Sequence, residues 1–233
     1  MRTFSRIGLG ALVGSFAAST ALAGPITVTA TDGFREASAH FEVSGGDLFV
    51  TLTNTTLNDV GVPIDVLIGV FFDLSSNATL TPISAVLNAG SSVLFGVAGP
   101  GGDVGGEWAY RGAIAGPDNT EYGISSAGLG IFGPGNRFNA NNLQGPADPD
   151  GLQYGLVSAG DNPATGNTPV TGTNALIKNA VVFRFDAPAN FDPMAEVGNV
   201  WFQYGTDLSE PRIPEPASLS LLALGGLALL RRR

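Results

Sequence analysis

The chain of 233 residues contains no cysteine at all. Without thiols it has no disulfide bond, no cysteine nucleophile and no thiolate that could bind a metal ion. No covalent cross-link therefore supports the folded part of the chain. Its stability must come from the core alone.

Histidine is almost as scarce, because His40 is the single example. One imidazole without any thiolate cannot supply the usual ligand set of a zinc site. A serine hydrolase would need His40 as its base, yet no Gly-x-Ser-x-Gly elbow accompanies it. Ser125 and Ser126 lie in a glycine-flanked stretch that misses this spacing. We therefore predict a protein that is not an enzyme.

Basic residues are few between Gly24 and Ile213, where six face nineteen acidic residues and the formal charge is −13. Such a surface repels nucleic acid and anionic lipid headgroups. We expect no nucleic-acid partner. The same charge attracts cations and keeps an exported protein soluble.

The first 23 residues have the three parts of a secretory signal peptide. Arg2 and Arg6 give a positive start, residues 7–18 are apolar, and Ala21 and Ala23 match an A-x-A cleavage site. We expect an N-terminal signal helix, export by the Sec machinery, and cleavage by signal peptidase after Ala23.

The last twenty residues also consist of three parts. They are Pro214, Glu215 and Pro216, an uncharged apolar run at 217–230, and the basic end Arg231, Arg232 and Arg233. As a helix, the apolar run would be about 21 Å long, against a hydrocarbon core of roughly 30 Å. It predicts a short transmembrane helix in a tail that a membrane enzyme reads and removes.

This ending resembles the PEP-CTERM sorting signal of bacterial exosortase systems, with Pro214, Glu215 and Pro216 in the place of the name-giving motif. The resemblance covers residues 214–233. It implies a Gram-negative bacterium that makes exopolysaccharide, transient anchoring in the inner membrane, and cleavage near the motif by an exosortase-type enzyme. Delivery to the cell surface or the extracellular matrix would follow. Arginines at both ends favour the same topology, with the part between them outside the inner membrane.

We place an extracellular β domain at residues 24–211 and the sorting signal at residues 212–233. Residues 39–43 and 48–53 alternate around a Gly-Gly turn and predict an antiparallel hairpin with one buried face. Residues 62–73 are nearly all apolar, as in a strand buried on both faces. Short strands between Gly- and Pro-rich turns predict an antiparallel β-sandwich or jelly roll.

Gly, Pro, Asn and Asp crowd residues 96–173, which we expect to form long loops with a few short strands. Aromatic rings and amides there suit a carbohydrate, because amides bind hydroxyls and rings give a platform for sugars. The candidate ligand-loop residues are Trp108, Tyr110, Tyr122 and Asn141. The alternative is that these aromatic residues close the end of the sandwich.

Two sets of carboxylates suggest further chemistry in the same region. Glu107 and Glu121 are the residue type of a glycoside hydrolase, which needs two carboxyls about 5 to 9.5 Å apart. Asp148 and Asp150, followed by Asp161, concentrate oxygen ligands that suit calcium. The alternative for these aspartates is ordinary Asx turns.

Taken together, the sequence predicts a non-enzymatic surface or matrix protein, sorted through an exosortase-type system and acting in adhesion or in the exopolysaccharide matrix. A carbohydrate-binding module and a secreted glycoside hydrolase are the alternatives. Calcium is the one cofactor that the residues leave open.

Overall fold

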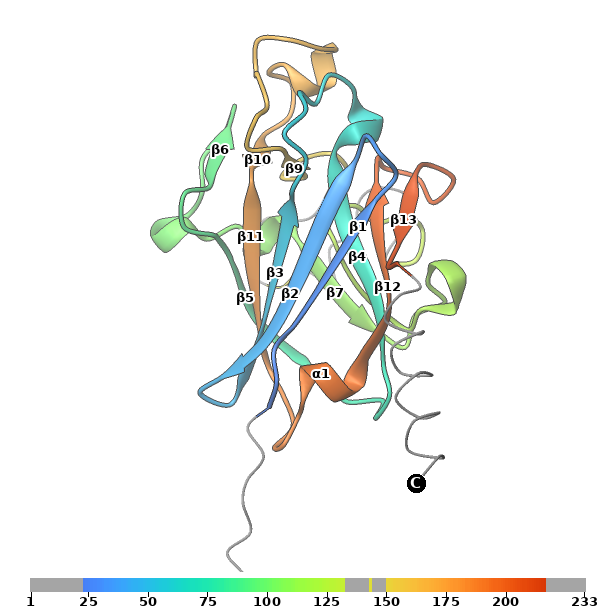
Figure 1. Cartoon of the computed structure of the whole chain (residues 1–233). Helices are drawn as coiled ribbons and strands as arrows, with labels where there is room; N and C mark the ends of the chain where they lie inside the picture. Colours follow the sequence, from blue (N-terminus) through green and yellow to red (C-terminus); the bar gives the residue numbers. More distant parts are fainter. Residues whose placement is uncertain (1–22, 133–142, 144–149, 217–233) are drawn as a thin grey trace, which may run out of the picture.

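The structure is a computed structural model that describes residues 23–132, 143 and 150–216 (Figure 1). Within these ranges no helix is long and apolar enough to cross a membrane. Several predicted features lie outside the described residues: the signal segment before Ala23 with Ala21, the loop residues Asn141 and Asp148, the apolar run 217–230, and Arg231, Arg232 and Arg233.

The described chain consists mainly of β-strands, which confirms the predicted class. The first sheet has five strands in the order β1-β2-β3-β11-β5. These strands are β1 (Ile26–Thr31), β2 (Glu36–Ser44), β3 (Asp47–Asn54), β11 (Ala180–Asp186) and β5 (Thr81–Leu87).

The second sheet has eight strands and follows the path β13-β12-β4-β9-β10-β6, with β8 paired to β4 and β7 paired to β8. Its strands are β13 (Arg212–Pro214), β12 (Val197–Tyr204), β4 (Leu67–Leu74), β9 (Leu156–Val157), β10 (Leu176–Lys178), β6 (Ser92–Leu94), β8 (Tyr122–Ser125) and β7 (Ala109–Gly112). Because β9 and β10 run parallel, this sheet is mixed and not purely antiparallel as predicted.

Helical structure is limited to single turns in the described part of the chain. The α-helix α1 (Pro193–Glu196) leads directly into β12. The 3₁₀ turns are η1 (Pro63–Asp65), η2 (Pro100–Gly102), η3 (Gly105–Glu107), η4 (Pro117–Asn119) and η5 (Thr168–Val170).

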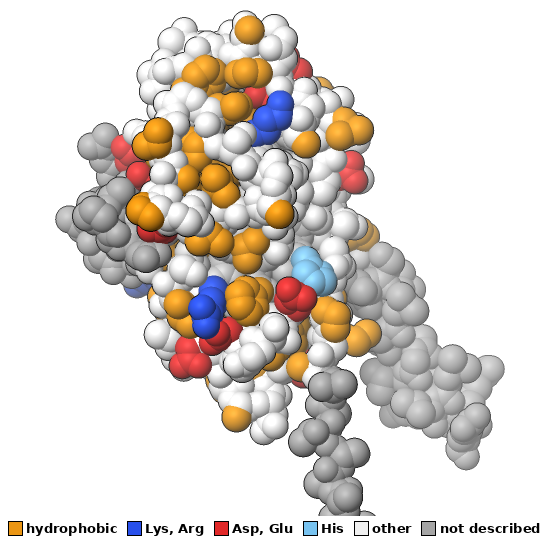
Figure 2. Space-filling view, turned by 90° about the vertical axis from the view of Figure 1, so that its left-hand side faces the viewer, with side chains coloured by type: hydrophobic (Ala, Val, Ile, Leu, Met, Phe, Trp, Pro, Cys, Tyr) orange, Lys and Arg blue, Asp and Glu red, His pale blue; other side chains and the backbone are white. Residues whose placement is uncertain are grey.

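The hairpin of β2 and β3 forms as the alternation predicts. Gly45 and Gly46 take φ values of 63° and 94° in the turn, a region that glycine enters without a steric penalty. Phe41 on β2 pairs with Val50 on β3, and both are fully buried. On the outer face of this hairpin, serine and threonine side chains alternate with the charged side chains of Glu36, Glu42 and Asp47. Figure 2 shows the histidine beside charged and apolar side chains.

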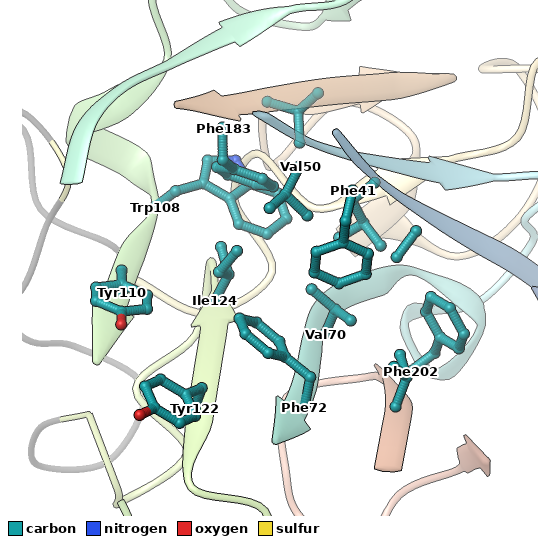
Figure 3. Packing of buried hydrophobic residues seen from close by; sticks show 14 of the residues in the cluster. Phe41, Val50, Val70, Phe72, Trp108, Tyr110, Tyr122, Ile124, Phe183 and Phe202 are labelled. Atoms are coloured by element: carbon teal, nitrogen blue, oxygen red, sulfur yellow. The ribbon is translucent and has the colours of Figure 1, made fainter. Parts of the chain in front are cut away.

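Strand β4 is buried on both faces, which confirms the prediction from its apolar run, although η1 delays its start to Leu67. One face carries Phe72, which meets Phe41 of the first sheet in an edge-on contact with ring centroids 5.3 Å apart (Figure 3). The other face carries Phe71, whose ring lies 6.0 Å from that of Phe132 in the long loop region. Strand β4 therefore belongs to two hydrophobic cores at once.

A partly buried charge network ties the β1–β2 turn to the second sheet. The Arg35 guanidinium lies 2.6 Å from Asp65 of η1 and 2.8 Å from Asp32. It also lies 5.8 Å from the ring centroid of Tyr204 on β12. Asp65 is only 8% exposed, so its carboxylate depends on Arg35 for charge compensation.

We expect Arg35→Ala to lower the free energy of unfolding by about 3–5 kcal/mol, because it leaves Asp65 buried and uncompensated. Arg184→Ala is the matched control, since Arg184 is 47% exposed and pairs with Asp47 at the surface. This control should cost less than about 1 kcal/mol. Urea unfolding of both variants measures the difference, and equal losses would contradict the proposed role of Arg35.

Candidate functional site

The predicted sorting motif begins inside the fold. β13 pairs antiparallel with β12, so that Ile213 faces Phe202 across the ladder. Ile213 is 3% exposed, and the N–H of Glu215 donates to the carbonyl oxygen of Val200 at 2.8 Å. Backbone pairing and the burial of Ile213 therefore carry the folded part of the chain beyond residue 212, where the sorting signal is predicted to begin, as far as Glu215.

An open groove of about 570 Å³ lies between the motif and the edge of the first sheet. Pro214, Glu215 and Pro216 line one side of this groove, and Thr29, Thr31 and Glu36 line the other. Burial raises the pKa of Glu215, and the N–H groups of Asn199 and Val200 oppose the rise. The sequence gives no signal for this groove, because strands far apart in the chain form its two walls.

A second depression of about 390 Å³ lies where β7 and β8 meet the chain before β5. Asn77, Thr79, Tyr110, Ala113, Glu121 and Tyr122 are among the residues that line it. Figure 3 shows the two tyrosines side by side at one end of the aromatic cluster. Two of the four predicted ligand-loop residues, Tyr110 and Tyr122, are thus brought together.

The rings of these tyrosines belong to the core. Tyr110 and Tyr122 are 9% and 6% exposed. Tyr110 lies 4.8 Å from the ring of Phe185, and Tyr122 stacks on Phe72 at 5.7 Å. The Tyr122 hydroxyl donates to the carbonyl oxygen of Ala78 at 3.0 Å. Burial raises the pKa of both hydroxyls, so they stay protonated at neutral pH and offer polar edges, not stacking faces.

Trp108 cannot act as a ligand platform, and its assignment as a ligand residue is wrong. Its side chain is fully buried and meets Phe183 of the first sheet at 5.0 Å between ring centroids. The position just before β7 directs the indole between the two sheets (Figure 3). The alternative to a ligand site was that the aromatic residues close this end of the domain. The rings of Trp108, Tyr110 and Tyr122 do fill the interior there.

Glu107 and Glu121 lie at opposite ends of the β7–β8 pair. Ala109 pairs with Ser125 at one end and Gly112 with Tyr122 at the other, while Glu107 and Glu121 lie just beyond these ends. By this register Glu121 lies level with position 113, six residues from Glu107. At about 3.3 Å per residue the two are roughly 20 Å apart along the ladder, more than the 5 to 9.5 Å of a glycosidase pair. These two residues therefore do not form the predicted carboxylate pair.

Of the aspartates predicted for calcium, Asp150 and Asp161 lie in the described ranges, and each accepts a hydrogen bond from the protein. Asp150 accepts a hydrogen bond from the Gln153 amide at 3.0 Å. Asp161 accepts one from the Val60 N–H, also at 3.0 Å. In residues 23–132, 143 and 150–216, no group of three or more His, Cys, Asp or Glu side chains is placed to hold a metal ion.

The Asp161 carboxyl instead lies next to the like-charged carboxyl of Asp59. Asp161 is 4% exposed, and burial together with the neighbouring Asp59 raises its pKa, against the opposing effect of Lys178. The Thr165 hydroxyl and the Asn162 N–H bind Asp59 and lower its pKa. The two carboxyls therefore titrate apart, with Asp161 as the one that keeps its proton longer.

Comparison of the chain with models of protein families, with curated proteins and with solved structures finds no match.

The raised pKa of Asp161 predicts a pH-dependent gain in the variant Asp161→Asn. Above the ordinary pKa of 3.8, the folded chain binds more protons than the unfolded chain, so ionisation of Asp161 lowers the free energy of unfolding as the pH rises. Asparagine cannot ionise but keeps an acceptor for Val60. From about pH 4 to about pH 7, the free energy of unfolding of the variant should therefore rise relative to that of the wild type.

Urea unfolding at the two pH values measures this gain. Asp186→Asn, at an exposed end of β11, is the control and should follow the wild type at both pH values. A constant difference between Asp161→Asn and the wild type would contradict the assignment.

Proposed function

We propose that this chain is an exported protein that an exosortase-type system sorts and processes, and that it then acts without catalysis at the cell surface or in the exopolysaccharide matrix of a Gram-negative bacterium. The position of the Pro-Glu-Pro motif supports this proposal. The folded domain ends within this motif, and the apolar segment predicted to enter the membrane begins directly after it. At the other end, Gly24, the residue that follows the predicted cleavage site, is hydrogen-bonded to Asp192 of the folded domain.

The pairing of β13 limits where the processing enzyme can cut without damaging the domain. A cut before Arg212 would remove an edge strand and expose the site of Ile213, whose burial is worth about 1.5–3 kcal/mol. A cut after Pro216 leaves the sheet complete. We therefore place the cut on the C-terminal side of Pro216, and we take the motif and its groove as the surface that remains on the mature protein.

The arrangement of the two sheets belongs to the same proposal. We assign it to the β-sandwich class with a jelly-roll-like layout, supported by the aromatic core that the inner faces share. A closed sandwich with a charge of −13 suits a soluble domain held outside the cell by its tail.

Intact mass and cell fraction of the native protein test the sorting proposal. With an active processing enzyme, the mature species should begin at Gly24, end after Pro216, and appear in the outer fraction. A chain truncated after Pro216 is the control; it should keep the same fold but never associate with the inner membrane. Retention of Arg233 together with inner-membrane location, in cells that have the active enzyme, would overturn the proposal.

A carbohydrate-binding role is the second candidate, and the depression beside β7 and β8 favours it. The Tyr110 and Tyr122 hydroxyls, the Glu121 carboxylate and the Asn77 amide are polar groups of the kinds that bind sugar hydroxyls. An opening of about 390 Å³ suits one or two sugar units, since small-molecule sites begin at roughly 300 Å³.

For this role, Glu121→Ala should weaken binding of exopolysaccharide purified from the producing strain by roughly tenfold, because a charged hydrogen-bond acceptor is lost. Isothermal titration measures the change. Glu42→Ala is the control, since Glu42 is 53% exposed on the opposite sheet. Equal affinity of the two variants would remove this depression as the sugar site. Trp108→Ala is unsuitable as a test of sugar binding, because loss of the buried indole would leave a cavity in the core.

A further inference from the structure

We propose that Asp192 is the receiving site for the α-ammonium group that signal-peptide removal creates on Gly24, and that this ion pair closes the fold of the mature protein. The inference rests on the cleavage site of the proposed function. It adds a structural role for the new N-terminus, which neither the signal peptide nor the sorting tail implies.

The geometry around Gly24 is that of a bound chain end. The Gly24 nitrogen donates to Asp192 Oδ1 at 2.9 Å, although 168 residues separate the two. The Gly24 carbonyl oxygen accepts a hydrogen bond from the Met194 N–H at 3.1 Å. Asp192 Oδ1 also accepts the Met194 N–H at 3.2 Å, as the N-cap of α1. Both polar groups of Gly24 are therefore fixed by one short segment.

Cleavage gives the Gly24 nitrogen a positive charge while that nitrogen stays hydrogen-bonded to Asp192. Water hydrolyses the Ala23–Gly24 amide, so that Ala23 leaves with a carboxylate and Gly24 keeps an ammonium group. The hydrogen bond to Asp192 then joins two charged groups, and such bonds are about twice as strong as neutral ones. A second carboxylate, that of Glu196, lies close by, with Oε1 3.4 Å from the Asp192 nitrogen.

The site also accounts for a glycine at position 24. A Cβ placed there would lie 3.2 Å from Met194 Sδ and 3.3 Å from Met194 Cβ. These distances are tighter than most real Cβ contacts, so a larger residue would require Met194 to shift by a few tenths of an ångström. Glycine lets the nitrogen approach Asp192 closely.

The ion pair joins the ends of the two sheets. Gly24 leads into β1, an edge strand of the first sheet, and α1 leads into β12 of the second sheet. Figure 1 shows α1 at the base of the molecule, near the lower ends of β1 and β12. Signal-peptide removal would therefore strengthen this closure only after the chain has been exported.

Two purified chains that both continue to Arg233, kept in mild detergent, test the inference. One begins at Gly24, released by a protease that leaves an N-terminal glycine, and the other begins at Ala21. At about pH 6.5, the chain with the free Gly24 amine should unfold roughly 2–4 °C higher. Asp192→Asn should abolish this difference, whereas Asp186→Asn, at the exposed end of β11, should preserve it.

The pH dependence gives a second readout that needs no variant. An ion pair raises the pKa of the ammonium above its ordinary value of about 7.7–8.0. The stability it contributes is complete below that value and is lost as the pH rises through the raised pKa. The advantage of the Gly24 chain should therefore vanish above roughly pH 9.5.

Equal unfolding midpoints of the two chains at pH 6.5 would overturn the inference, as would an advantage that persists in Asp192→Asn or at high pH. If Asp192→Asn does not fold, the comparison of the two wild-type chains across pH still decides. The outcome is separate from export, because both chains are made without it. Mass analysis of the cellular protein tests the cleavage site by itself.

Discussion

The double burial of strand β4 is the constraint on which the rest of this structure depends. A strand with apolar side chains on both faces needs a cover on each. The first sheet supplies one cover through Phe41, which meets Phe72. The Gly- and Pro-rich region supplies the other, through residues such as Phe132 against Phe71. This long loop region is therefore part of the core, and its short strands β8 and β9 extend the sheet directly beside β4.

Patterns within a few neighbouring residues were enough to predict the β2–β3 hairpin and the buried strand β4. The β2–β3 hairpin follows from alternation around two glycines, and β4 follows from an apolar run with β-branched and aromatic residues. The burial of Trp108 depends on Phe183, which lies 75 positions further along the chain and on the other sheet. No pattern within a few residues of Trp108 carries that information, so a loop aromatic that contacts a ligand and one that fills the core look alike in sequence.

In the candidate site, too, contiguous motifs could be predicted from sequence and contacts between distant residues could not. Sequence alone predicts a Pro-Glu-Pro sorting motif and a signal cleavage site, because both patterns are short and contiguous. It did not predict that Arg212–Pro214 would pair with β12, since a three-residue strand that ends in proline has almost no β signature of its own. The contact between Gly24 and Asp192 was equally hidden, because 168 residues separate the two in the chain. Both missed features arise from non-local pairing that closes the fold.

Pro214, at the end of β13, affects how readily this edge of the second sheet can pair with a strand of another molecule. Glu215 and Ile213 direct their backbone groups toward β12, so the nitrogen of Pro214 faces the open edge of the sheet. Proline has no N–H there, so this edge lacks one of the donors that another strand would need for pairing. If copies of the chain crowd together in a matrix, as proposed, the missing donor would weaken edge-to-edge joining into fibres. Pro214 of the predicted sorting motif would then have this second effect.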